Sequence, residues 1–202
     1  MGLVGSEMCI RDRIHAGARN KTKVNLHWIH SSKLETQDCK SVLKNIHGII
    51  VAPGFGSRGI EGKIKAVHYA RTKKIPFLGI CLGMQCAVVE FARNVLKMEN
   101  ANSIEIDSET KFPVISMMEE QKKLKKMGGT MRLGAYKCDI EKETLLQKIY
   151  KKETILERHR HRFEFNNKYV KEFESKGLIF SGKNSKNQLM ETIEIKDHPW
   201  FI

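Results

Sequence analysis

A cysteine flanked by glycines stands between two apolar segments, and this arrangement restricts the fold more than any other feature of the chain. The run Ile75–Ile80 is typical of a buried strand, and Leu82–Leu96 follows helical periodicity and is apolar almost all round. Between them, Gly79–Gly83 reads G-x-C-x-G, the thiol counterpart of the G-x-S-x-G nucleophile turn. A side chain at either glycine would collide with the adjoining strand or helix. The sequence therefore predicts a strand, a tight turn that presents Cys81, and a buried helix.

The same alternation precedes this turn. The apolar run Gly48–Pro53 is typical of a strand that is covered on both faces, and the glycine-rich segment Gly54–Gly59 follows it. Positions 60, 64, 67 and 71 then follow helical spacing. Strands that alternate with helices of this length predict a parallel sheet with a right-handed crossover.

Further strands and short helices are indicated elsewhere. Val24–His30 alternates as a half-buried strand does, and Ser41–His47 suits a short helix. Later segments favour strands at Phe112–Met118, Tyr136–Ile140, Arg160–Phe165, Leu178–Ser181 and Leu189–Ile195, and short helices at Lys142–Tyr150 and Lys168–Lys176. The predicted class is α/β, with a mostly parallel central sheet flanked by helices and a smaller antiparallel, strand-rich C-terminal portion.

Composition limits the classes of protein that remain. A chain of 202 residues with 41% hydrophobic and 29% charged residues is typical of a soluble globular protein. The net charge of +13 suggests a polyanionic partner, but the charges are spread along the chain, so we expect no nucleic-acid partner. The longest apolar stretch, Ile75–Ala92, is interrupted too often to span a membrane. Met1–Arg13 lacks the apolar core of a cleavable signal and is interpreted as a stray extension.

The cysteines indicate a reducing environment. There are five, at irregular spacing and without a C-x-x-C pair, so neither a disulfide framework nor a zinc site is expected. Cys81 at a helix N-terminus would be favoured as the thiolate, whereas Cys86, inside the apolar helix, should be a buried structural residue. The same structural role is the alternative for Cys81.

A nucleophilic cysteine that attacks an amide also needs donors for the oxyanion. Backbone N–H groups of the Gly54–Gly56 loop and of Leu82 would serve, because both follow strands at the same edge of the predicted sheet. A phosphate-binding role for Gly54–Gly59 is the weaker alternative, since the spacing fits neither common phosphate loop.

Five segments together carry a resemblance to a known family. The glutaminase domain of the CTP synthase family, a class I glutamine amidotransferase, is similar to this chain from about Ile14 to Ile202. The similar segments are Pro53–Gly59, Pro76–Gln85, Met98–Ser103, Gly128–Gly134 and Glu157–Glu164. Any class I amidotransferase would supply the cysteine turn. Gly128–Gly134 and the Arg-His-Arg-His-Arg run of the last segment are what indicate CTP synthase.

The resemblance implies both an activity and a site. L-Glutamine would be hydrolysed through a thioester on Cys81, and the ammonia would pass to a synthetase domain that aminates UTP with ATP. The pocket would be lined by Gly54, Leu82, Gly83, Met84 and Gln85, with Glu105 at the substrate α-amino group and Arg162 at its α-carboxylate. A zwitterionic substrate calls for one carboxylate and one cation, which suits this pair. Without the resemblance, Glu105 would be interpreted as a surface acid and Arg158–Arg162 as an exposed basic strand.

The resemblance also implies what lies outside the chain. No cofactor is expected in it, and ATP and Mg would bind only the synthetase domain of a cytoplasmic homotetramer that has no membrane partner. His159 and His161 alternate onto one face, but no third ligand follows at a suitable spacing, so no metal site is predicted.

One departure from the family concerns catalysis. The His/Glu acid–base pair of the family would follow Ile202, and His198 is not assigned to that role because Trp200 stands where the glutamate is needed. We therefore expect residues 1–13 to be an unmatched extension and residues 14–202 an incomplete glutaminase domain that is inactive by itself. The alternatives are a glutamine-binding or regulatory module that has lost catalysis, and a basic polyanion-binding protein.

Overall fold

The computed structural model describes residues 5–117 and 131–202, with side chains from residue 11 onward. Three features considered above therefore lie outside the described residues: the last residue of the predicted strand Phe112–Met118, the lysine-rich segment 122–126, and the Gly128–Thr130 part of one family-like segment.

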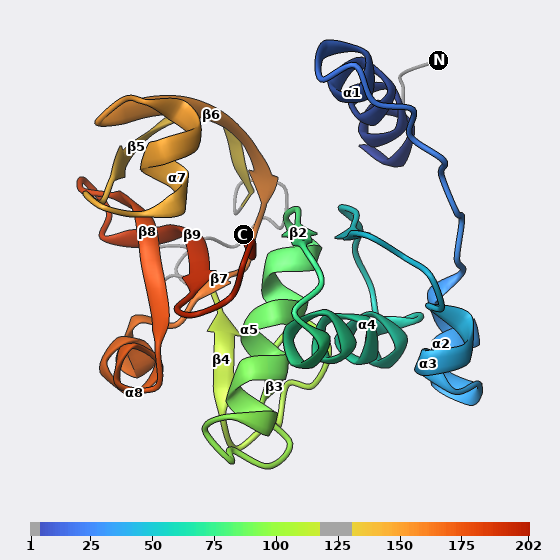
Figure 1. The fold of residues 1–202 in the computed structure, drawn as a ribbon. Helices are drawn as coiled ribbons and strands as arrows, with labels where there is room; N and C mark the ends of the chain where they lie inside the picture. Colours follow the sequence, from blue (N-terminus) through green and yellow to red (C-terminus); the bar gives the residue numbers. More distant parts are fainter. Residues whose placement is uncertain (1–4, 118–130) are drawn as a thin grey trace.

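Helices precede the first sheet. α1 (Gly5–Arg19) stands at the edge of the molecule, and an extended segment joins it to α2 (Ser31–Thr36) (Figure 1). α3 (Cys39–Val42) begins two residues before the predicted helix and is shorter. The division predicted after residue 13 falls within α1 and stays a prediction.

The strand predicted over Val24–His30 is wrong. This segment is extended but pairs with no described strand, and the side chain of Trp28 is 66% exposed. A strand is stabilised by hydrogen bonds to a neighbour, and alternation alone does not supply one.

The predicted parallel unit is confirmed in the middle of the chain. β1 (Ile49–Val51), α4 (Ile60–Lys73), β2 (Phe77–Gly79) and α5 (Leu82–Asn94) follow in that order. β1 and β2 are parallel. Residues 200–202 run along the other side of β2, where Phe77 N–H donates to the Trp200 carbonyl (3.0 Å) and Gly79 N–H to that of Ile202 (2.8 Å).

The second half is rich in antiparallel strands, as predicted. A small mixed sheet has the order β3-β4-β7, and a four-stranded antiparallel sheet has the order β6-β5-β8-β9. The bounds are β3 Asn102–Ser103, β4 Pro113–Ser116, β5 Arg132–Ile140, β6 Thr154–His161, β7 Glu164–Phe165, β8 Leu178–Asn184 and β9 Leu189–Ile195. The short helices are α7 Leu145–Tyr150, η2 Asn167–Tyr169 and α8 Val170–Ser175.

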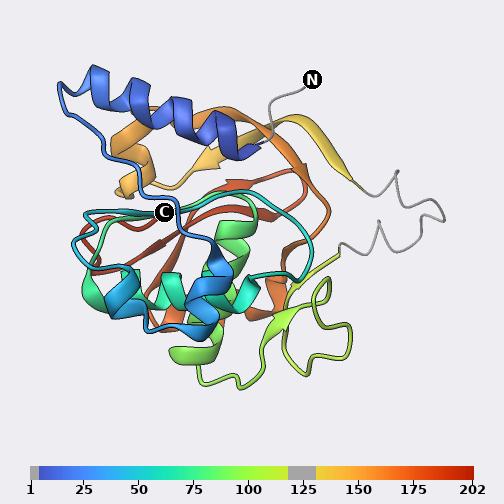
Figure 2. The ribbon, with the colours of Figure 1, turned by 90° about the vertical axis from the view of Figure 1, so that its right-hand side faces the viewer.

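The predicted strand Arg160–Phe165 is divided between two sheets. β6 ends at His161 and β7 begins at Glu164, so residues 162 and 163 form a corner between the sheets. In Figure 2, the β5–β6 pair lies across the molecule from α2 and α4. The corner therefore connects the antiparallel sheet to the strands beside α5.

Aromatic side chains form the core between the two halves. Phe77 stacks on Phe201 with ring centroids 4.5 Å apart, and Phe91 of α5 stacks on Phe173 of α8 at 5.5 Å. All four are fully buried, so the helix that follows the cysteine packs on one continuous apolar core.

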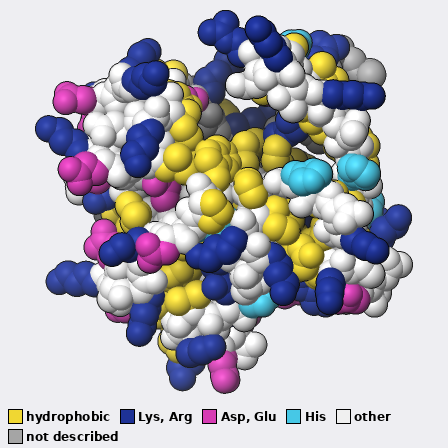
Figure 3. Space-filling model, in the orientation of Figure 1, with side chains coloured by type: hydrophobic (Ala, Val, Ile, Leu, Met, Phe, Trp, Pro, Cys, Tyr) yellow, Lys and Arg dark blue, Asp and Glu magenta, His cyan; other side chains and the backbone are white. Residues whose placement is uncertain are grey.

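Basic side chains are spread over the one face of the molecule that the space-filling view shows. Figure 3 shows Lys and Arg side chains scattered across one whole face rather than gathered in a stripe. Among the described residues, no helix has the length and apolar character needed to cross a membrane.

Candidate active site

Cys81 occupies the tight turn that the glycines predict. Its backbone has φ 56° and ψ −103°, a conformation that is costly for a side-chain-bearing residue, at the point where α5 begins. A β-carbon built on Gly79 would lie 2.7 Å from the carbonyl carbon of Gly83, and one built on Gly83 would lie 2.3 Å from the carbonyl oxygen of Val51. The two glycines therefore allow the strand, the turn and the helix to approach closely enough to hold Cys81 in this strained conformation.

The thiol is less acidic than the sequence predicts. The backbone N–H of Leu82 lowers the pKa of Cys81, as expected at a helix N-terminus, but burial outweighs it and the carboxylates of Glu105 and Glu164 add to the rise. The pKa of the Cys81 thiol is consequently raised above its ordinary value, and the expected preference for thiolate is wrong for the chain without substrate.

Cys86 has the structural role predicted for it. It is buried, and burial raises the pKa of its thiol to about 12. Cys81, by contrast, is only partly buried. The two thiols of α5 and its start therefore occupy different environments.

The loop after β1 lies against the start of α5. A β-carbon built on Gly54 would lie 3.2 Å from Leu82 Cδ2, so the two predicted sources of oxyanion donors are neighbours. The adjacent Phe55 side chain is 91% exposed. The structure thus brings together Gly54, Leu82 and Cys81 at the carboxyl ends of β1 and β2.

Three other predicted pocket residues lie in the first turn of α5. Gln85 Nε2 donates to the carbonyl of Phe163 at 3.2 Å and ties the helix to the corner between β6 and β7. Met84 is partly buried against the core, and Gly83 is buried against β1. The Gln85 side chain therefore holds the backbone of the β6–β7 corner against the start of α5.

The predicted charged residues flank this region. Glu105 is exposed just after β3, and its backbone N–H donates to Ser103 Oγ at 3.2 Å. The charge of its carboxylate raises the pKa of the Cys81 thiol. Arg162 is half-buried in the corner that Gln85 contacts. The charges predicted for the two ends of an amino acid thus come from two segments, the loop after β3 and the corner between β6 and β7.

In the part of the chain that the structure describes, no histidine is among the groups that shift the pKa of the Cys81 thiol. Both nitrogens of His198 are engaged elsewhere: Nε2 donates to the Ala70 carbonyl, and Nδ1 accepts from the backbone N–H of Trp200, each at 3.2 Å. Its ring packs edge-on against Phe201, with centroids 5.3 Å apart, so His198 lies between α4 and the C-terminal segment. His198 is a packing residue, which agrees with leaving it unassigned.

A buried ionic cluster near the corner was not predicted as a unit. We name it the Arg132 ring; its members are Arg132, His159, His161, Glu164 and Glu191. Two of the family-like segments contain four of these residues, but nothing in the local pattern links them to β9. Within the described ranges, no group of three His, Cys, Asp or Glu side chains is arranged to hold a metal ion.

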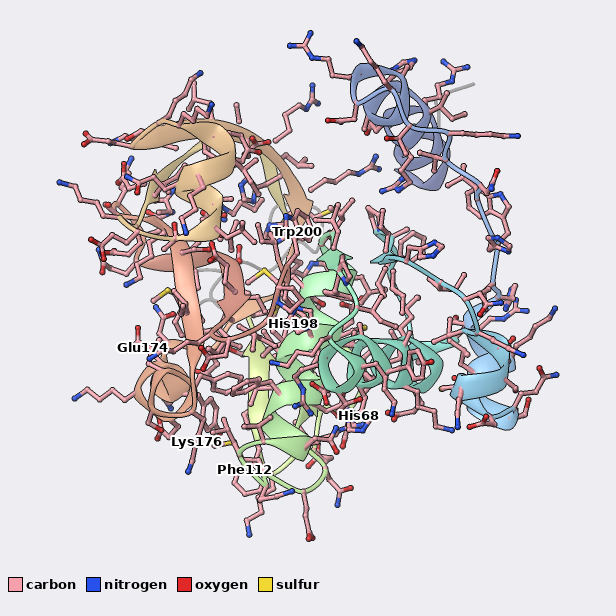
Figure 4. All side chains as sticks on the ribbon, in the orientation of Figure 1. His68, Phe112, Glu174, Lys176, His198 and Trp200 are labelled. Atoms are coloured by element: carbon pink, nitrogen blue, oxygen red, sulfur yellow. The ribbon has the colours of Figure 1, made fainter. Side chains whose placement is uncertain are left out.

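A hollow of about 550 Å3 lies elsewhere, lined by residues that include Lys97, Asp107 and Phe112. Figure 4 places Phe112 below the lower end of α5, and Trp200 at the upper end beside β2. The hollow is therefore at the opposite end of the helix from Cys81 and is not part of the candidate site.

The chain is similar to known proteins along almost its whole length. Residues 9–202 match the family described as Glutamine amidotransferase class-I. The chain is 49% identical over 210 residues to the CTP synthase of Christiangramia forsetii, which aligns all of this chain with 38% of that protein. It is 55% identical over 189 residues to the CTP synthase of Cytophaga hutchinsonii, which aligns 94% of this chain with 35% of that protein. The chain thus spans less than half the length of these relatives.

A solved structure agrees along nearly the whole chain. The glutaminase domain of Trypanosoma brucei CTPS with bound acivicin superposes with a TM-score of 0.89 at 33% identity, covering 96% of this chain and 76% of that one. The predicted fold class is confirmed by this match. Taken with the cysteine turn and the family match, the comparison shows that the chain belongs to the class-I glutamine amidotransferases.

Proposed function

We propose that this chain is the ammonia-releasing part of a CTP synthase and that its substrate is L-glutamine. The observation that carries the proposal is the strained turn that presents Cys81 at the start of α5, with the Gly54 loop against Leu82. A buried structural cysteine such as Cys86 needs neither a strained backbone nor two glycines around it. The relatives named above support the wider assignment to CTP synthase.

The reaction is acyl transfer in two steps. The Cys81 sulfur attacks the side-chain amide carbon of glutamine, the carbon–nitrogen bond breaks, and ammonia leaves with the proton that the thiol gave up. Water then attacks the thioester, releasing glutamate and restoring the thiol. The N–H groups of Leu82 and of the Gly54 loop would stabilise the oxyanion that forms in each step.

The two ends of glutamine select it among amides. Glu105 would bind the α-amino group and Arg162 the α-carboxylate, with Gly83, Met84 and Gln85 forming the wall between them. A bound α-ammonium beside Glu105 would also neutralise a charge that raises the pKa of Cys81. Substrate binding would therefore favour the reactive thiolate.

Hydrolysis also needs a proton carrier beside the sulfur. The titratable groups that act on Cys81 among the described residues are Glu105 and Glu164, and neither is an imidazole. We propose that the acid–base histidine comes from outside residues 1–202. A protein of these 202 residues alone should be acylated at Cys81 but should turn over glutamine poorly, and it would then act as a glutamine-binding module.

The remainder of the assignment concerns the whole protein. A synthetase domain of the same polypeptide would bind UTP, ATP and Mg and would consume the ammonia, in a cytoplasmic homotetramer. None of these ligands requires a site in the present chain.

The direct test measures both half-reactions in the complete protein. It should hydrolyse glutamine and convert UTP to CTP with glutamine and ATP, and acivicin should add to a peptide containing Cys81. Cys81→Ala should abolish glutamine hydrolysis and labelling, while Cys86→Ala serves as the control because that thiol is buried in the core. Full activity in the Cys81→Ala protein, or labelling that remains elsewhere, would contradict the proposal.

The separate question of the histidine needs the 202-residue chain. Acivicin should label it at Cys81, whereas sustained release of glutamate at the rate of the complete protein would show that these residues contain their own acid–base group.

A further inference from the structure

The Arg132 ring joins three strands through one buried guanidinium. Arg132 begins β5 and is 4% exposed. Its Nη2 lies 2.6 Å from Glu191 Oε1 in β9, and its Nη1 lies 3.2 Å from Glu191 Oε2 and 3.3 Å from Glu164 Oε1 in β7. The guanidinium also lies over the ring of Tyr136, 4.2 Å from its centroid. Only the planar, multidentate head of an arginine satisfies both carboxylates from one position.

Two imidazoles lie on the other side, next to the carboxyl groups of Glu191 and Glu164. His159 Nε2 lies 3.1 Å from Glu191 Oε2, His159 Nδ1 lies 2.9 Å from His161 Nε2, and His161 Nδ1 lies 3.4 Å from Glu164 Oε1. Burial lowers the pKa of both histidines to about 4, so both are neutral at pH 7. Burial and Glu191 raise the pKa of Glu164 to about 8, against the opposing effect of Arg132. The ring then holds one cation, one carboxylate and one neutral acid, which is a balanced set for a buried site.

The ring is continuous with the candidate site through the corner at residues 162 and 163. Glu164 directly follows this corner, and its carboxylate, when charged, raises the pKa of the Cys81 thiol. The Phe163 carbonyl accepts from Gln85 Nε2, and the Gln85 backbone N–H donates to the Cys81 carbonyl at 3.2 Å. Arg162 lies in the same corner, so its position depends on what fixes the residues on either side of it.

We propose that Arg132 is a positioning residue for glutamine binding: by joining Glu191 to Glu164, it holds the corner that carries Arg162 against the start of the Cys81 helix. This inference rests on the proposed function. Arg132 touches neither the thiol nor a substrate in this arrangement, and it acts through the corner. Without it, the buried Glu191 carboxylate would lose its cation and Glu164 would lose the donor that joins it to β5, so nothing would hold the corner in place.

The test compares two reagents that modify Cys81. Acivicin is shaped like an amino acid and should require Arg162 in the corner, whereas iodoacetamide should not. In the complete protein, Arg132→Met should raise the KM for glutamine and lower the rate of acivicin labelling by about tenfold or more, since small displacements of a binding group have large effects. Alkylation of Cys81 by iodoacetamide, which has no amino-acid end to bind, should change by less than about threefold if the turn itself is intact. The control is Arg158→Met, which changes an exposed arginine of β6 outside the ring. It should leave the KM for glutamine, the rate of acivicin labelling and the rate of alkylation by iodoacetamide unchanged.

A second variant keeps the test decisive if Arg132→Met does not fold. Glu191→Gln retains the volume and an acceptor but removes the charge that Arg132 grips with both nitrogens, and it should raise the KM by about threefold to tenfold. The inference is overturned if folded Arg132→Met or Glu191→Gln keeps the original KM and acivicin rate, or if acivicin and iodoacetamide labelling fall by the same factor. Absence of glutamine hydrolysis and acivicin labelling in the unmutated protein would instead overturn the proposed function, and this inference with it.

Discussion

The tightest contact around the candidate nucleophile is at Gly83, and Gly83→Ala tests it. The added β-carbon would lie 2.3 Å from the Val51 carbonyl oxygen, 3.1 Å from its carbonyl carbon and 3.2 Å from its β-carbon. These atoms belong to β1, so the obstacle is backbone of a paired strand rather than a flexible side chain. Overpacking of this kind costs about 1–3 kcal/mol.

A hydrogen bond shares the same atom. The Val51 carbonyl accepts the Ile80 N–H at 3.0 Å, and displacing it would cost about 1 kcal/mol more. Alanine recovers up to about 1 kcal/mol as a better helix former than glycine. We expect Gly83→Ala to reduce the free energy of unfolding by about 2 kcal/mol, which lowers Tm by about 4–8 °C for a chain of this size. Acivicin labelling of Cys81 should fall by at least about tenfold because the turn must shift.

Gly48→Ala is the matched control for this change. A β-carbon on Gly48, just before β1, would lie 3.6 Å from the Pro76 carbonyl oxygen and 4.0 Å from its β-carbon, which is ordinary contact. Its stability should stay within about 0.5 kcal/mol of the original. Urea denaturation and acivicin labelling of both variants give the comparison. Equal stability and equal labelling in the two variants would refute the argument that close backbone approach at Gly83 holds the turn.

Two further predictions concern charge. Glu105→Gln should remove a carboxylate that raises the pKa of Cys81, so iodoacetamide should react about twofold faster at pH 8, while the KM for glutamine rises by about tenfold or more; an unchanged KM, or a slower reaction with iodoacetamide, would contradict the assigned role. In acid, the folded pKa values of about 4 for His159 and His161 lie below their ordinary 6.5, and that of Glu164, about 8, lies above its ordinary 4.5. Between pH 6.5 and 4.5 the unfolded chain therefore binds two more protons than the folded chain at the histidines and one fewer at the glutamate, which is a net difference of one proton. Because the unfolded chain binds the extra proton, the free energy of unfolding falls by about 1.4 kcal/mol for each pH unit of acidification. Replacing both histidines with glutamine should reverse the slope, so that acidification stabilises the protein; urea midpoints at pH 6.5 and 5 measure it, and an unchanged slope would be the contrary result.

The turn at Cys81 could be predicted because its causes are local. The two glycines, the apolar run before them and the apolar helix after them are adjacent in sequence, and steric contact between adjacent segments follows from chain geometry. The parallel unit follows for the same reason. Val24–His30 had a local pattern too, but a strand also requires a partner, and partners are chosen by the rest of the molecule.

The acidity of Cys81 was mispredicted because the deciding groups are distant in sequence. The helix start is visible from the pattern, whereas burial and the carboxylates of Glu105 and Glu164 come from packing. The Arg132 ring has the same origin, since β5, β6, β7 and β9 each contribute to it. Local motifs contained most of its members without indicating that they touch.

The strained, positive-φ backbone of Cys81 makes the reactivity of its thiol depend on the packing of the whole domain. That conformation persists only while β1 and α5 press on the turn from both sides, because a free peptide would relax to a more favourable one. On gentle warming, the sulfur should thus lose its affinity for amino-acid-shaped reagents before circular dichroism reports any melting of helices.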